Sequence, residues 1–113
     1  FEFGDESPGI AGLGFLAGNV IRLPQSSEYP IPRIGWADSR GNFDFLGLNE
    51  GEVLDFYYLH SFCVKPKNYD IVAIETENSI VSAIQYKNMY GCQFHPEKSH
   101  KNGLKILKTF ASC

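Results

Sequence analysis

Residues 91–100 read GCQFHPEKSH, where a histidine, a proline and a glutamate directly follow an apolar phenylalanine. In extended backbone, residues i and i+2 project to the same side, and proline also biases the residue before it towards extended geometry. His95 and Glu97 should therefore lie side by side. Glu97 can then accept a hydrogen bond from one imidazole nitrogen and leave the other nitrogen free as a base. A histidine base oriented by a carboxylate supplies two of the three members of a nucleophilic triad.

Other groupings of reactive residues are weaker. A strand-end histidine beside a solvated glutamate is the alternative interpretation of the same tripeptide. The adjacent pair His60–Ser61 cannot form a serine–histidine couple within a strand, because neighbouring side chains point to opposite faces. A metal site could be assembled only from residues without recognised zinc-ligand spacing, namely His60, Cys92, His95, Glu97 and His100. We therefore expect no metal and no cofactor.

The third member of a triad, the nucleophile, is not evident among the three cysteines. Cys63 lies in an apolar run, where burial raises the pKa of a thiol and makes it inert. Cys92 precedes His95 by three residues, which places it on the opposite face of a strand. Cys113 is the last residue of the sequence. None of the three is expected to act as the nucleophile.

Composition sets the class of protein. The sequence has 113 residues, 43% of them hydrophobic, which fits one globular domain or part of one. The net charge of −3 arises from interspersed charges and does not suggest a nucleic-acid partner. Three cysteines without a CxxC pair are typical of a reducing cytoplasm. No apolar run approaches the roughly 20 residues of a membrane span. We expect a cytoplasmic protein without nucleic-acid or membrane partners.

Hydrophobic patterning predicts a β-rich chain that ends in a helix. Five Gly and one Pro make residues 1–18 a loop, and short extended segments are expected at 19–23 and at 31–38, the second turning at DSRGN. The strongest strand signal is the run 55–64, DFYYLHSFCV. Segments 71–76, 80–86 and 89–95 follow with short connections, which predicts buried antiparallel neighbours. After Ser99, helical spacing places one set of residues on an apolar face, namely Leu104, Leu107, Phe110 and Ala111.

Several motifs together resemble a known family. The segment GCQFHPEKS followed by an amphipathic helix resembles the C-terminal signature of class I (triad) glutamine amidotransferases. The stretches GLGFLAGNVIRLP, IPRIGW, YYLHSF and GLKILKTF resemble one branch of it, the glutaminase subunits of imidazole glycerol phosphate synthases. The resemblance covers nearly the whole chain in the same order. It implies an α/β fold, the C-terminal part of a flavodoxin-like mixed sheet flanked by helices, here β-rich with one clear C-terminal helix.

The resemblance also implies what is missing. In this family a G-x-C-x-G elbow carries the nucleophilic cysteine, just upstream of a segment like FEFGDES, with which this sequence begins. Residues 1–113 would then be a partial glutamine amidotransferase domain without the nucleophile. The 113-residue chain alone would be inactive, although the full-length protein would be an enzyme.

Roles for individual residues follow from the same resemblance. His95 would be the general base and Glu97 its orienter. The backbone at Ser61 and Phe62 would hold the substrate L-glutamine, and the side chain of Glu6 would contact its amino group. Many relatives have Tyr where this sequence has Phe62. A further pair, Tyr57 and Lys98, would face the partner, a cyclase or synthase subunit of the (βα)8-barrel type.

The implied function is hydrolysis of L-glutamine to glutamate and ammonia. The ammonia would pass to a synthase subunit that makes imidazole glycerol phosphate and AICAR in histidine biosynthesis. Two alternatives remain open from the sequence. A paralogue could supply ammonia for sugar-nucleotide amidation in surface polysaccharide synthesis, or the chain could be a non-catalytic module that binds a synthase.

Overall fold

The computed structural model describes residues 1–5, 9, 11–14, 16–23, 32–76 and 79–113. Its strands are β1 (Phe3–Gly4), β2 (Gly18–Arg22), β3 (Arg33–Gly41), β4 (Val53–His60), β5 (Phe62–Pro66), β6 (Val72–Thr76), β7 (Val81–Tyr86) and β8 (Met89–Cys92). Its helices are the 3-10 turns η1 (Tyr69–Ile71) and η2 (Pro96–Lys98) and the α-helix α1 (His100–Ala111). The β-rich chain with one C-terminal α-helix is confirmed.

The strands form two sheets. A three-stranded sheet has the order β1-β2-β5, and a five-stranded sheet has the order β4-β3-β6-β7-β8. The antiparallel sequence β6-β7-β8 confirms the prediction from the short connections. Within the described residues, β1 with β2 is the one parallel pair. This pair corrects the expectation that residues 1–18 contain no regular element.

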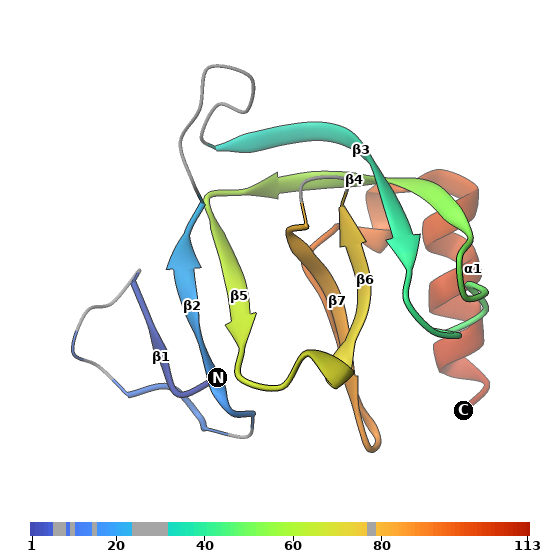
Figure 1. The fold of residues 1–113 in the computed structure, drawn as a ribbon. Coiled ribbons are helices and arrows are strands. Elements are labelled where there is room, and N and C mark those ends of the chain that lie inside the picture. The colour runs from blue at the N-terminus through green and yellow to red at the C-terminus, as the bar shows by residue number, and fades with distance from the viewer. Residues whose placement is uncertain (6–8, 10, 15, 24–31, 77–78) are drawn as a thin grey trace.

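The aromatic run 55–64 is not the single strand that its composition predicted. It breaks at Ser61 into β4 and β5, which belong to different sheets. Figure 1 shows β4 crossing the molecule and then turning sharply into β5, which lies beside β2. The Ser61 carbonyl accepts a hydrogen bond from the Leu23 backbone N–H at 2.9 Å. We call residues 60–62 the corner, since they change the direction of the chain.

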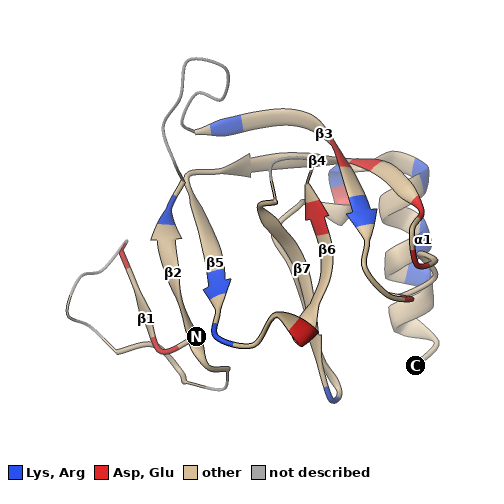
Figure 2. Ribbon diagram, viewed as in Figure 1, with Lys and Arg blue, Asp and Glu red and all other residues tan. Residues whose placement is uncertain are grey.

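Two further boundaries differ from the prediction. β3 continues through the expected turn at residues 38–42 and ends at Gly41, because residues 39–41 pair with β6. β8 ends at Cys92 and its residues are only half-buried or exposed, whereas β6 and β7 are buried as predicted. The main core lies between the five-stranded sheet and α1 and includes Phe56, Phe94 and Ile106. Figure 2 shows acidic and basic residues spread over the strands and α1.

The helix α1 begins where the pattern predicted, but it buries a different face. Its buried residues are Gly103 and Ile106. The expected apolar face is about half exposed, with Leu104 at 50%, Leu107 at 44% and Phe110 at 53%. Gly103 explains the difference, because its missing side chain lets the helix approach the carbonyl of Pro96. The close approach turns Ile106 into the core.

Candidate active site

His95 and Glu97 lie in contact, as their spacing predicted. The His95 Nδ1 atom is 2.8 Å from Glu97 Oε1, and a carboxylate oxygen can only accept, so Nδ1 carries the hydrogen. Nε2 is then the nitrogen available as a base. The backbone route differs from the expected extended one. His95 is extended at φ −96°, ψ 98°, while Glu97 lies in the 3-10 turn η2 that Pro96 begins.

Backbone hydrogen bonds attach His95 to strand β4. The His95 N–H donates to the Tyr57 carbonyl at 2.9 Å. The His95 carbonyl accepts from the Lys98 N–H at 3.0 Å and from the Ser99 hydroxyl at 2.7 Å. Ser99 Oγ in turn accepts from the Tyr57 N–H at 2.9 Å. Sequence reasoning overlooked Ser99, because a serine before a helix is typical of an ordinary N-cap.

Glu97 is expected to remain ionised under mildly acidic conditions. A hydrogen bond from its own backbone N–H and, next, one from His95 hold the pKa of Glu97 below the usual 4.5. A carboxyl group with a lowered folded-state pKa stabilises the fold above its ordinary pKa, and this contribution is lost as pH falls through the lowered value. An NMR titration of the side-chain carboxyl carbon should therefore give a midpoint below 4.5. A midpoint at or above the ordinary value would show that the contact with His95 is absent in solution.

The two residues that the resemblance assigns to a partner lie together. The Lys98 ammonium lies 5.7 Å from the centre of the Tyr57 ring. Trp36 contacts the edge of the same ring at 6.1 Å and stacks on His100 at 5.4 Å. Trp36 is 46% exposed, which is high for an indole. This surface, made of Trp36, Tyr57, Lys98 and His100, is called the aromatic face below.

The segment that the resemblance assigns to glutamine forms the corner. His60 Nδ1 is 2.7 Å from the Phe62 carbonyl oxygen, so Nδ1 is the protonated nitrogen. His60 is buried, and its Nε2 has no hydrogen-bond partner among the described residues. Burial is the main cause that lowers the pKa of His60, with the charges of Arg33 and His95 adding to it. Because both corner carbonyls are engaged, the peptide planes on either side of Phe62 are fixed. The predicted Glu6 contact lies outside the described residues.

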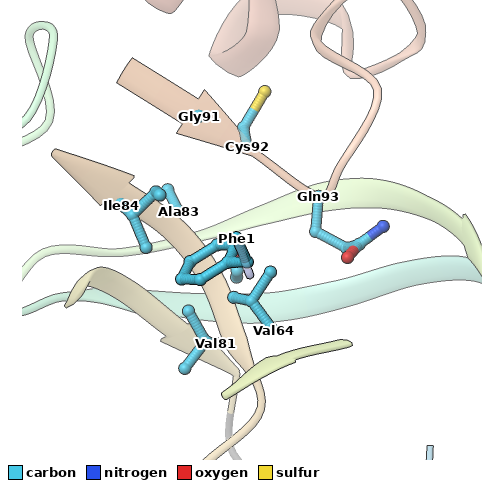
Figure 3. Close-up of a pocket in the computed structure, with 9 residues that line it drawn as sticks. Phe1, Val64, Val81, Ala83, Ile84, Gly91, Cys92 and Gln93 are labelled. Atoms are coloured by element: carbon cyan, nitrogen blue, oxygen red, sulfur yellow. The ribbon is translucent and has the colours of Figure 1, made fainter. Parts of the chain in front are cut away.

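The environments of two cysteines make their thiols poor nucleophiles. Cys63 is 5% exposed, and burial raises the pKa of its thiol. Cys92 is exposed overall, yet the protein around its thiol raises the pKa of Cys92 to about 11, and the Glu97 carboxylate adds to this effect. Figure 3 shows the Cys92 sulfur pointing away from the Phe1 ring, which fills the space beside Val64 and Val81.

These environments predict an order of alkylation. At pH 8 only about one in a thousand Cys92 thiols would be the reactive thiolate. We expect iodoacetamide to modify the exposed Cys113 first, with Cys63 and Cys92 at least tenfold slower, followed by mass spectrometry of peptides. Rapid modification of Cys92 would contradict the raised pKa and would make this thiol a candidate nucleophile.

Two features of the described part of the chain bear on other chemistries. Within it, no three His, Cys, Asp or Glu side chains gather in a group that could hold a metal ion. Its longest helix, α1, has 12 residues, and none of its helices is long and apolar enough to cross a membrane.

Comparison with known proteins connects this geometry to a family. The family model for glutamine amidotransferase class-I matches residues 19–112. The imidazole glycerol phosphate synthase subunit HisH of Pyrococcus furiosus is 41% identical over 97% of this chain and 57% of its own length. A HisH subunit of Vibrio vulnificus is 42% identical over 87% of this chain and 48% of its own length. The chain thus spans about half the length of the curated relatives it matches.

A solved structure supports the fold. A GMP synthase subunit from Thermoplasma acidophilum superposes with a TM-score of 0.67 at 18% identity, over 84% of this chain and 47% of its own. At this identity the likeness shows the fold alone. The family model, by contrast, matches from β2 to the end of α1 and includes the His95–Glu97 pair. This chain therefore belongs to the class-I glutamine amidotransferases.

Proposed function

We propose that this chain is part of a glutaminase subunit of imidazole glycerol phosphate synthase. The full-length protein would hydrolyse L-glutamine to glutamate and pass the ammonia to a synthase subunit. The observation that carries this proposal is the 2.8 Å contact between His95 and Glu97, in a chain whose similar relatives are named as subunits of that synthase. No observation favours sugar-nucleotide amidation or a non-catalytic role over it.

The chemistry follows from the two nitrogens of His95. Nδ1 is held by Glu97, so Nε2 can move a proton. A cysteine thiolate from outside residues 1–113 would attack the glutamine carboxamide, and backbone N–H groups would stabilise the oxyanion. His95 would protonate the departing ammonia and then remove a proton from the water that hydrolyses the thioester. Glu97, ionised at neutral pH, would stabilise the imidazolium formed in each half of the reaction.

Substrate and partner contacts belong to the same proposal. We assign glutamine binding to the backbone of Ser61 and Phe62, because the fixed corner holds its peptide planes in one orientation. Glu6 would contact the substrate amino group. The aromatic face, with Tyr57 and Lys98, would meet the (βα)8-barrel synthase in a heterodimer. Its mix of a cation and half-exposed rings is typical of protein interfaces.

The test is an assay of a full-length protein that contains this chain. We expect glutamate to appear when glutamine is supplied together with the synthase partner and its nucleotide substrate, and imidazole glycerol phosphate to form without added ammonium. Ammonium salts should replace glutamine in the second reaction. Glutamate formation without imidazole glycerol phosphate would indicate another acceptor, and absence of both would favour the non-catalytic interpretation.

A further inference from the structure

Ser99 stands at the usual capping position of α1 but does not cap it. An N-cap serine normally accepts a hydrogen bond from an N–H in the first turn of its helix. The Ser99 side chain makes no such bond. Its hydroxyl instead accepts from the Tyr57 N–H and donates to the His95 carbonyl. The helix therefore gives up a stabilising contact, and the hydroxyl is used to join β4 to the residue before Pro96.

The direction of the His95 side chain depends on its backbone. Its imidazole is 37% exposed and hydrogen-bonds to Glu97, which is itself 58% exposed. Neither side chain is held by dense packing. The His95 N–H and carbonyl are both bonded, through Tyr57 on one side and through Lys98 and Ser99 on the other. These bonds fix φ and ψ of His95 and thus the direction in which its Cα–Cβ bond points.

We propose that Ser99 is a positioning residue for His95, whose buried hydroxyl fixes the His95 peptide against strand β4 and so aims the imidazole at the substrate. This inference rests on the proposed function, in which His95 is the general base. Ser99 is 1% exposed and touches neither solvent nor the open side of the site. It acts through His95 and takes no part in the reaction itself.

The matched control is Ser39. It is also 1% exposed, and its hydroxyl bonds the Tyr58 hydroxyl at 2.6 Å rather than His95. Ser39→Ala and Ser99→Ala thus remove the same atom from equally buried places. Loss of stability alone should affect the two variants alike. Displacement of the base should affect only Ser99→Ala.

The experiment measures glutaminase kinetics in the full-length protein bound to its synthase. We expect Ser99→Ala to lower kcat at least tenfold with KM within threefold, because a misplaced base slows the reaction without weakening substrate binding. The NMR midpoint of Glu97 should rise in the same variant, since a loosened His95 stabilises the carboxylate less. Ser99→Thr, which keeps the hydroxyl, should restore much of kcat. Ser39→Ala should leave kcat and the Glu97 midpoint unchanged.

Equal kinetics in Ser99→Ala and Ser39→Ala would overturn the proposal, as would a rise in KM with kcat unchanged. If Ser99→Ala does not fold, Ser99→Cys replaces it, because a thiol is a weak donor of nearly the same shape. Wild-type kcat in Ser99→Cys would also refute the role of the hydroxyl. Failure of the proposed function is separate, since the wild-type complex would then release no glutamate, while the Glu97 midpoint would still report on Ser99.

Discussion

Replacing His95 by Asn in a full-length protein that contains this chain should lower glutamine-dependent ammonia formation by about 10²–10⁴-fold. The Asn side-chain amide can take the place of Nδ1–H and keep the 2.8 Å contact with Glu97. It has no nitrogen that can accept a proton, so both proton transfers would be lost. The effect should appear in kcat, because the proposed glutamine contacts lie at Ser61 and Phe62 rather than at His95.

Two measurements separate this loss from general damage. Ammonium-supported activity of the synthase partner should be unchanged in His95→Asn, since the aromatic face is intact. Lys101→Ala, an exposed change on α1, should match the wild type in both reactions. Wild-type glutaminase activity in His95→Asn would remove His95 from the mechanism and leave the base unidentified.

The contact between His95 and Glu97 could be predicted because the cause is local. Two residues on either side of a proline have few backbone choices, and both the extended path and the observed 3-10 turn bring the side chains together. The pairing of β6, β7 and β8 was equally accessible, since short connections leave antiparallel neighbours as the simple solution.

The remaining features depend on contacts that are distant in sequence. The run 55–64 has the composition of one strand, and the break at Ser61 reflects the pairing of β5 with β2. The helix face was misjudged because glycine carries no hydrophobic signal, although Gly103 decides how closely α1 approaches Pro96. Ser99 has the same residue type that an N-cap needs. Its bond to Tyr57 spans 42 residues and leaves no local pattern.

Replacing Gly103 by Ala should destabilise the protein, although the same change inside most helices stabilises them by about 1 kcal/mol. A methyl group at Gly103 would collide with the Pro96 carbonyl oxygen and lie 2.7 Å from its carbon, both rigid backbone atoms. That oxygen already accepts the Ser99 N–H at 3.1 Å. Either α1 or η2 must move, and overpacking of this kind costs about 1–3 kcal/mol.

Movement of η2 would also displace Glu97, which lies in it, from His95. We therefore expect Gly103→Ala to lower the free energy of unfolding and to reduce glutaminase kcat at least tenfold, as measured by denaturant titration and by glutamate release. Gly4→Ala is the matched control, because its added methyl would meet Val20 Cβ at an ordinary 3.5 Å. A Gly103→Ala protein as stable as the wild type would mean that α1 does not pack on Pro96 in solution. A destabilised variant with normal kcat would show that η2 keeps its position while the helix yields, so that the site depends on β4 rather than on α1.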